Sequence, residues 1–246
     1  MRPTTKVIVR IDDVCQGNIR DIVRWTLSKH PDIPLSCFLY KTDQEWDIAA
    51  WRGVKDMIVK YGWEVGGHTR NHPFLSTVSK EKISQEIEGN IEDIEKNLTK
   101  VGLSYKVKSF AYPYGDYDER VKDVLKAIDI PIGLTFPDGY PYESLGEKIN
   151  PLEFGITCNG KLPAEVLNNK FTKVHDRKGI YCICLHVKVA KPYGGCIQKV
   201  LSAAKYKVEK NKLAKMCENL DRHFDFIKSH KGVEFTTFRS LLGNLL

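Results

Sequence analysis

The sequence predicts an α/β protein, a distorted or incomplete (β/α) barrel with parallel strands. Short apolar runs alternate with amphipathic stretches from one end of the chain to the other, which is typical of strand–helix units around a parallel sheet. Seven apolar runs in 246 residues fit one barrel better than two domains. No linker-like stretch rich in Pro, Ser and Gly divides the chain, so we expect a single domain over residues 1–246.

The expected strands are short runs of β-branched and other apolar residues. They span residues 6–11, 35–40, 63–65, 107–111, 132–136, 180–185 and 233–238. The expected helices carry apolar residues three or four positions apart, so that one face of each can cover the sheet. They span residues 19–27, 48–60, 79–98, 121–128 and 213–227. Residues 137–178 are rich in Gly, Pro and Asn and are expected to be irregular.

Composition places the chain among soluble globular proteins. Hydrophobic residues make up 42% and charged residues 28% of the sequence, which argues against disorder. No apolar run is long enough to cross a bilayer. The beginning of the sequence lacks the apolar region of a secretory signal, and the seven scattered cysteines include no Cys-x-x-Cys pair. We therefore expect reduced thiols and a cytoplasmic location.

The net charge of +7 does not define a partner, because the basic residues are spread along the chain. The densest basic stretch, residues 199–215, alternates with apolar residues at helical spacing and is interpreted as a solvated helix face. We therefore expect neither a nucleic-acid partner nor a membrane partner. The oligomeric state stays open.

Polar residues that can carry chemistry follow four of the predicted strands. The carboxyl ends of parallel barrel strands gather at one face, so we expect these side chains to meet there. They are Asp12 and Asp13 after the first strand, His68 and His72 after the third, the turn Tyr112-Pro113-Tyr114-Gly115 after the fourth, and Leu185-His186 at the end of the strand expected over 180–185.

Two histidines and a carboxylate make a metal-binding pattern. His68 and His72 are separated by three residues, so both imidazoles can reach one ion from a helical face or from a turn. One aspartate of the pair Asp12-Asp13 completes a set of two imidazoles and one carboxylate that leaves a coordination position open for water. The other aspartate can then act as general base.

Two further groups suit an acyl-transfer reaction. His186, at the end of a strand, could give a proton to a leaving amine. A backbone N–H beyond Pro113 could donate to an oxyanion, because proline and glycine together favour a tight, rigid turn. The remaining histidines are expected at the surface: they are His30, His175, His223 and His230.

In this order the motifs resemble the polysaccharide deacetylase family, also called the NodB homology group or carbohydrate esterase family four. The resemblance covers roughly residues 5–240, nearly the whole chain. It implies a distorted (β/α) barrel and one divalent metal ion, usually zinc, with Co²⁺, Ni²⁺ or Mn²⁺ as alternatives. It also implies hydrolysis of the N-acetyl group of an amino sugar, a chitooligosaccharide or a polysaccharide, with release of acetate.

The resemblance also assigns roles to residues by position. Asp12 resembles the general base, and Asp13 with His68 and His72 resembles the metal-ligand set. His186 resembles the general acid. The backbone N–H of Tyr114 would help to hold the oxyanion, and Leu185 would line the pocket for the acetyl methyl group. Tyr112 and Pro113 of the same turn are expected to contact substrate.

The sequence also departs from the family pattern. Many members carry an arginine that holds the base carboxylate where this chain has Ala111, and Arg10 or Arg70 could take its place. The Trp-containing fourth motif is not evident, so Asp138 is the candidate for orienting His186. These departures keep two alternatives open. One is a hydrolase of the same fold that acts on a small non-sugar or cyclic amide, and the other is a catalytically silent glycan-binding protein.

Overall fold

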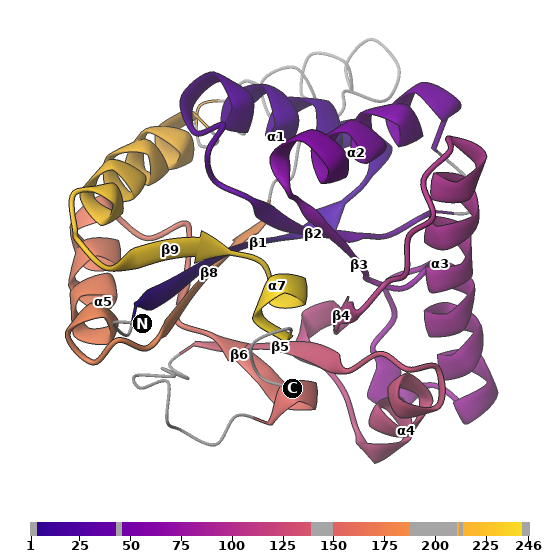
Figure 1. Ribbon diagram of the computed structural model, residues 1–246. Helices are drawn as coiled ribbons and strands as arrows, with labels where there is room; N and C mark the ends of the chain where they lie inside the picture. Colours follow the sequence, from indigo (N-terminus) through magenta and orange to yellow (C-terminus); the bar gives the residue numbers. More distant parts are fainter. Residues whose placement is uncertain (1–3, 43–45, 139–149, 187–210, 212–213, 243–246) are drawn as a thin grey trace, which may run out of the picture.

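The computed structural model describes residues 4–42, 46–138, 150–186, 211 and 214–242. Its nine strands form one parallel sheet that is nearly closed into a barrel with helices around it, which confirms the predicted fold class (Figure 1). The strand order is β6-β5-β4-β3-β2-β1-β8-β7, and β9 pairs with β1. The strands are β1 (Thr5–Val14), β2 (Leu35–Leu39), β3 (Glu64–Gly67), β4 (Ser109–Ala111), β5 (Ile132–Asp138), β6 (Phe154–Ile156), β7 (Cys158–Asn159), β8 (Ile180–His186) and β9 (Val233–Thr236).

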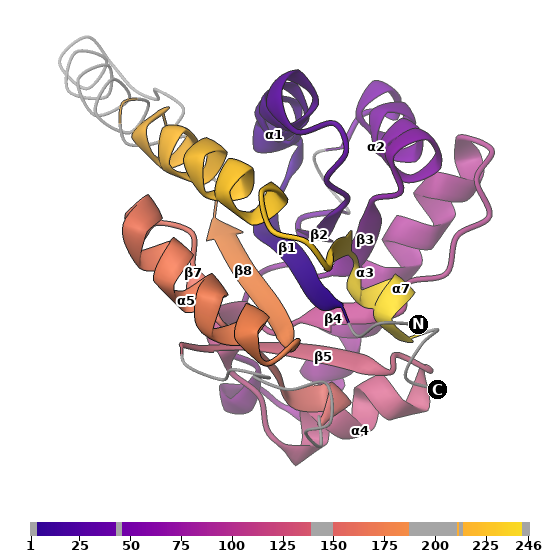
Figure 2. The ribbon, with the colours of Figure 1, turned by 60° about the vertical axis from the view of Figure 1, so that its left-hand side comes forward.

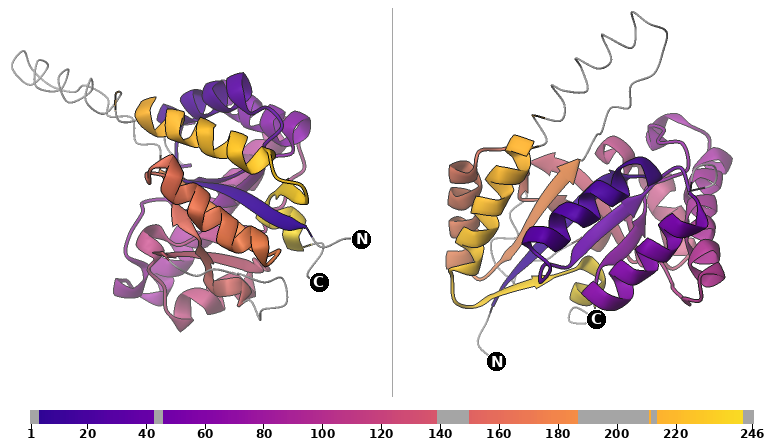
Figure 3. Two further views of the ribbon diagram at one scale, coloured as in Figure 1. Left: turned by 90° about the vertical axis from the view of Figure 1, so that its left-hand side faces the viewer. Right: turned by 90° about the horizontal axis from the view of Figure 1, so that it is seen from above.

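Helices cover the outside of this sheet, as Figures 1 and 2 show. They are α1 (Gln16–Lys29), α2 (Ile48–Tyr61), α3 (Lys80–Lys100), α4 (Glu119–Ala127), α5 (Ala164–Asp176), a helical stretch over residues 214–228, and α7 (Phe238–Leu242). The stretch 214–228 lies between α1 and α5 (Figure 3), where Phe224 packs against Trp25 of α1 and Phe226 packs against Phe171 of α5.

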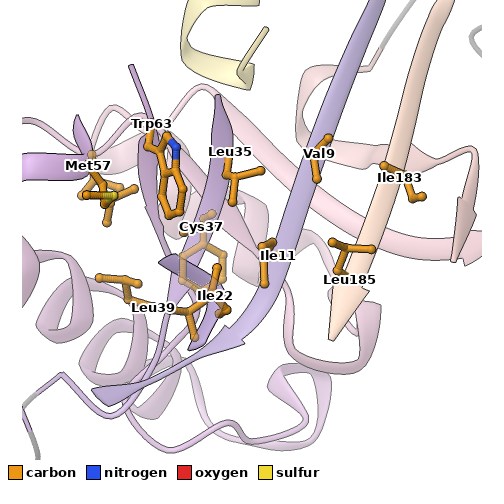
Figure 4. Packing of buried hydrophobic residues seen from close by; sticks show 14 of the residues in the cluster. Val9, Ile11, Ile22, Leu35, Cys37, Leu39, Met57, Trp63, Ile183 and Leu185 are labelled. Atoms are coloured by element: carbon orange, nitrogen blue, oxygen red, sulfur yellow. The ribbon is translucent and has the colours of Figure 1, made fainter. Parts of the chain in front are cut away.

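The central strand β1 shows how alternation separates two apolar layers. Val9 and Ile11 point outward and join the cluster beneath the helices, together with Ile183 and Leu185 of β8 and Ile22 of α1 (Figure 4). The neighbours of Val9 on either side in β1, Ile8 and Arg10, face the other way, and Ile8 belongs to the cluster inside the barrel. The side-chain period of two therefore assigns every second strand residue to the barrel interior.

The barrel interior is closed at the amino-terminal end of the strands. Phe238, the first residue of α7, contacts the rings of Phe38 and Phe154 at centroid distances of 6.1 and 5.1 Å. Figure 1 shows α7 in the middle of the ring of strands. The buried carboxylate of Glu64 accepts hydrogen bonds from Ser36 Oγ and from the backbone N–H of Arg239 in α7. This arrangement leaves the carboxyl ends of the strands for the polar motifs.

The prediction that residues 137–178 are irregular was wrong. This region contains a 3₁₀ turn (Pro151–Glu153), the short strands β6 and β7, and the helix α5. Strands of three and two residues are too short to show an alternating pattern. The helix does carry a signal, because Leu167, Phe171 and Val174 follow one another at steps of four and three and are all buried. The last strand is also shorter than expected, since β9 ends at Thr236.

Two histidines expected at the surface are buried. His30 bonds to Asp221 through Nε2 at 2.9 Å, and His223 contacts Tyr181 Oη at 2.9 Å and Asn168 Oδ1 at 2.7 Å. Burial lowers the pKa of His223 to about 4, so this imidazole is neutral at pH 7. Helix packing against α1 and α5 buries both rings, and local sequence does not reveal that packing.

Other expectations meet the structure only in part. All six described cysteines are free thiols. The part of the chain that the structure describes contains no helix with the length and apolar character of a membrane span. Most of the basic stretch 199–215 lies outside the described residues. The single domain over residues 1–246 and the cytoplasmic location stay predictions.

Candidate active site

The carboxyl ends of β1, β3, β4 and β8 bring the predicted site residues together. Asp12 of β1 pairs in register with His186 of β8, so both side chains reach the same level of the barrel. Left-handed backbone conformations gather here, with φ of 57° at Asp13, 57° at His72 and 60° at Tyr114. Such conformations cost about 1–3 kcal/mol in a non-glycine residue and concentrate at functional sites. His68 and His72 therefore lie in a turn and not on a helix.

Asp13, His68 and His72 place three donor atoms around one point. Asp13 Oδ1 lies 3.4 Å from His68 Nε2 and 3.0 Å from His72 Nε2. All three donor atoms lie within 4.8 Å of one another. Burial acts to raise the pKa of Asp13, but the two imidazoles outweigh this effect and hold the pKa below its usual range. The carboxylate is therefore ionised. Two imidazoles and one carboxylate form a donor set that suits a divalent transition ion.

The hydrogen bonds of His68 test whether this set fits a cation. His68 Nδ1 lies 2.7 Å from the carbonyl oxygen of Ala111, which can only accept, so the proton of the neutral ring is on Nδ1. The lone pair of Nε2 then faces the Asp13 carboxylate, and this buried nitrogen has no hydrogen-bond partner among the described residues. Two electron-rich atoms 3.4 Å apart repel each other unless a cation lies between them. The residues therefore fit a metal ion.

Contacts with α3 hold the turn that carries the two imidazoles. The backbone N–H of His68 donates to Asn90 Oδ1 at 2.9 Å, and Asn90 is fully buried. Arg70 donates two hydrogen bonds to the carboxylate of Asp93, at 2.8 and 2.9 Å. The N–H of His72 donates to Thr69 Oγ1 within the turn. These bonds fix both imidazoles before any ligand binds, as outer partners of metal ligands commonly do.

Arg10 contacts the second carboxylate of the pair. Its Nε and Nη2 atoms donate to the two oxygens of Asp12 at 2.7 and 2.6 Å, and both side chains are almost fully buried. Burial acts to raise the pKa of Asp12, but the Arg10 guanidinium outweighs this effect and holds the pKa below its usual range. Of the two arginines considered as partners of this carboxylate, Arg10 makes the contact and Arg70 pairs with Asp93.

His186 also lies near the Asp12 carboxylate. Its Nε2 is 4.0 Å from Asp12 Oδ2, and its ring meets the edge of Phe136 at a centroid distance of 5.0 Å. Burial lowers the pKa of His186, although Asp12 and Asp13 oppose the shift. Once protonated, this imidazole is a stronger proton donor than an ordinary histidine. Cys184, two residues earlier on the same face, places Sγ 3.6 Å from Asp12 Oδ2.

Two exposed aromatic rings stand next to the histidines. Phe74 and Tyr114 stack with ring centroids 4.0 Å apart and planes 11° from parallel, and their exposed fractions are 51% and 58%. Tyr114 also contacts His72, with ring centroids 4.6 Å apart. Large exposed apolar side chains that gather beside polar groups commonly mark a binding surface. Phe74 was missed from the sequence, because one aromatic residue in a loop carries no pattern.

The three residues expected to contact substrate are buried in the structure, and their substrate contacts stay predictions. Leu185 lies in the cluster beneath the helices, beside Ile183 (Figure 4). Neighbouring residues of a strand point to opposite faces, so its side chain and that of His186 project from opposite faces of β8. Cys184 occupies the inward position that Leu185 was expected to fill. Tyr112 is buried and donates its hydroxyl hydrogen to the carbonyl of Leu152 at 2.8 Å, and Pro113 is buried at the start of the turn.

Asp138 is the last residue of β5, and its backbone pairs with Ile156 of β6. Its role in orienting His186 stays a prediction. Tyr114 is the middle residue of the turn Pro113–Gly115, in the left-handed conformation already described.

A family model described as polysaccharide deacetylase matches residues 3–133, which is more than half of the chain. The chain therefore belongs to the polysaccharide deacetylase family. No match was found among curated proteins.

Solved structures share the fold at low sequence identity. The carbohydrate esterase family four domain of a multidomain xylanase from the hindgut metagenome of Trinervitermes trinervoides is 15% identical, with a TM-score of 0.59 over 98% of this chain and 91% of that chain. A family four carbohydrate esterase from Streptomyces lividans in complex with acetate is 14% identical, with a TM-score of 0.56 over 93% of this chain and 90% of that chain.

A third similar structure is a mutant, with restored enzymatic activity, of a family four pseudoenzyme from Bacillus anthracis. It is 15% identical, with a TM-score of 0.54 over 98% of this chain and 68% of that chain. The fold thus occurs both in enzymes and in proteins called pseudoenzymes, so the activity of this chain has to be argued from its own residues.

Proposed function

We propose that this protein is a metal-dependent hydrolase that removes the N-acetyl group from an amino sugar, a chitooligosaccharide or a related polysaccharide and releases acetate. The observation that carries the proposal is the meeting of two sets of groups. Asp13, His68 and His72 form the candidate metal site, and Asp12 with His186 lies beside it at the same end of the barrel. Metal ligands, a carboxylate base and an imidazole acid are the parts that amide hydrolysis needs.

Each group has a role in this reaction. A divalent ion held by Asp13, His68 and His72 would supply a Lewis acid that polarises the acetyl carbonyl and lowers the pKa of a water molecule. Asp12 accepts the proton of the attacking water, because it is ionised and held in place by Arg10. The backbone N–H of Tyr114 donates to the carbonyl oxygen as negative charge develops on it. His186 donates a proton to the nitrogen that leaves as the amine.

The stacked pair of Phe74 and Tyr114 supports a sugar substrate. The pair is apolar, exposed and adjacent to His72. A sugar ring has one face made largely of C–H groups, and aromatic rings in binding sites commonly provide the apolar contact for such a face. The pair can therefore hold the ring that carries the acetamido group while the acetyl carbon faces the metal ligands.

One observation favours the second candidate, a hydrolase of a small non-sugar or cyclic amide. Ala111 stands where many family members carry arginine, so the barrel interior of this chain is built differently beneath the site. A panel of chitooligosaccharides, N-acetylglucosamine and small linear and cyclic amides separates the two candidates. Activity confined to the small amides would favour the second.

Acetate release is the direct test of the proposed function. The purified protein loaded with zinc is expected to release acetate from chitooligosaccharides, and a chelator is expected to abolish the release, because the carbonyl then loses its Lewis acid. Added zinc should restore it. Acetate is quantified by an enzyme-coupled assay. No release with full metal occupancy across Zn²⁺, Co²⁺, Ni²⁺ and Mn²⁺ would contradict the proposal, and glycan binding under those conditions would support the silent binding protein.

Loss of the aromatic pair is expected to weaken substrate binding. Phe74→Ala should raise KM about 10-fold with kcat within about threefold, because stacking on an aromatic ring contributes about 1–1.5 kcal/mol before and during the reaction alike. Steady-state kinetics on the best substrate of the panel measures both constants. Val59→Ala is the matched control, since Val59 is 61% exposed on α2. An unchanged KM in Phe74→Ala would remove the pair from substrate binding.

A further inference from the structure

Beneath the site, the interior of the barrel contains an almost fully buried Arg–Asp pair. Arg10 is fully buried and points into the barrel from β1, the strand that also carries Asp12. It donates to both oxygens of Asp12, and its Nη1 donates to the carbonyl oxygen of Thr135 on β5 at 2.8 Å. The guanidinium thus spans the interior from β1 to β5 and joins the two strands through its hydrogen bonds.

Among the residues that the structure describes, Arg10 has a single ionic partner. Asp12 is the one carboxylate that it contacts among the described residues, and the Phe38 ring lies 5.6 Å from the guanidinium carbon. Burying a guanidinium costs desolvation free energy that its contacts have to offset, and removing its one carboxylate partner would leave an uncompensated buried charge. Two parallel hydrogen bonds fix both the position and the orientation of a carboxylate, whereas a single hydrogen bond leaves the carboxylate free to rotate.

Small residues on β3 and β4 provide the room for this arrangement. A side chain at Gly66 of β3 would approach the Phe38 ring to 2.4 Å, so glycine is needed there for the ring that packs against Arg10. Ala111 of β4 is fully buried in the same interior cluster as Phe38. Ala111 pairs with Leu134, the residue before Thr135, so β4 ends beside the carbonyl that Arg10 reaches. A long side chain at position 111 would compete with Arg10 for this space.

Building on the proposed function, we propose that Arg10 is the positioning residue that fixes the Asp12 carboxylate for proton transfer, and that it does so from β1 in place of an arginine at position 111 of β4. Arg10 donates to both carboxylate oxygens, and His186 Nε2 lies 4.0 Å from Oδ2, the oxygen that Arg10 Nη2 also contacts. Arg10 acts through Asp12 and contacts neither substrate nor metal ligands.

Kinetics of three variants test this positioning role, each loaded with zinc and assayed on the best substrate of the panel. Arg10→Met is expected to lower kcat about 100-fold with KM within about threefold and zinc content unchanged, since the loss concerns orientation of a base and not binding. Arg10→Lys should recover about 10-fold of that loss, because an ammonium can hold one oxygen but not two. Arg10→Met combined with Ala111→Arg should exceed Arg10→Met alone, because the vacated space accepts the new guanidinium.

A matched control comes from another pair of the same chemistry. Arg120 donates from two nitrogens to Asp118 at 2.9 and 2.6 Å outside the barrel. Arg120→Met is expected to leave kcat within about threefold. The proposal is overturned if Arg10→Met keeps kcat near the wild-type value, if it raises KM as much as it lowers kcat, or if Arg10→Lys equals wild type. If the Arg10→Met, Ala111→Arg protein has no higher kcat than Arg10→Met, the claim that an arginine at position 10 replaces one at position 111 is overturned.

Thermal unfolding provides a readout that needs no activity and still works if Arg10→Met is poorly stable. Arg10→Lys and Asp12→Asn are each expected to lower Tm, and the double variant should lose less than the sum of the two losses, because both changes break one contact. Additive losses would overturn the claim that Arg10 holds Asp12. If wild type releases no acetate, the proposed function fails, and this comparison alone decides whether Arg10 fixes Asp12.

Discussion

Asp13→Ala is expected to lower the zinc content of the purified protein from about one ion per chain to a trace, and to abolish acetate release. Asp13 Oδ1 is the donor atom shared by both imidazole contacts, at 3.4 and 3.0 Å, so its removal leaves two neutral ligands and no charge to offset the cation. Loss of an outer partner of a metal ligand costs about 10- to 100-fold in affinity, and loss of a ligand itself should cost more. Elemental analysis and the acetate assay measure the two effects.

A second ligand variant and a surface control make the result specific. His68→Ala should match Asp13→Ala, because the buried Nε2 of His68 has no other partner among the described residues. Asp21→Ala removes an exposed carboxylate of α1 and should keep both zinc and activity. Full zinc content in both ligand variants would show that this donor set does not hold the ion.

Asp12→Asn is expected to keep the zinc and lose turnover. The amide has nearly the same shape as the carboxylate but cannot accept the proton of the attacking water, so kcat should fall about 100- to 10,000-fold. The change also leaves Arg10 without its counter-charge in the barrel interior, and breaking a buried pair costs about 3–5 kcal/mol of stability. Tm must therefore be measured together with kcat and zinc content, and the assay run well below the unfolding transition.

The matched control is Asp118→Asn, which removes the carboxylate of a partly exposed Arg–Asp pair at the start of α4. This variant should lose some stability without losing kcat. Turnover near the wild-type value in folded Asp12→Asn would exclude Asp12 as the base, and loss of zinc in that variant would assign Asp12 to the metal site.

Most of the candidate site could be predicted from the order of the polar motifs along the chain. Asp12, Asp13, His68, His72 and His186 each follow a strand that periodicity revealed, and parallel strands bring their carboxyl ends to one face. Leu185 shows where this reasoning stopped. The side-chain period of two would have placed it opposite His186, and Cys184 on the same face, without any coordinates.

Other features could not be predicted from local sequence patterns. The helix α5 has a regular apolar face, but the Gly- and Pro-rich segment around it concealed the signal. His30 and His223 are buried because helices distant in the sequence pack over them. Phe74 belongs to the candidate binding surface because it stacks on Tyr114, 40 positions later in the chain. Two separate loops have to come together to form this stack.

The sequence by itself determined which residues could bind a metal, accept a proton or donate one, because these capacities belong to side-chain chemistry and to motif spacing. Its pattern of alternating strands and helices also determined the class of fold, since such alternation favours a parallel sheet whose apolar face is covered by the helices. The tertiary structure decided how these groups are used. It determines which nitrogen of His68 faces Asp13. It also determines that Arg10 contacts Asp12 while Arg70 pairs with Asp93. Such choices depend on distances between separate strands, and a linear pattern carries no such distances.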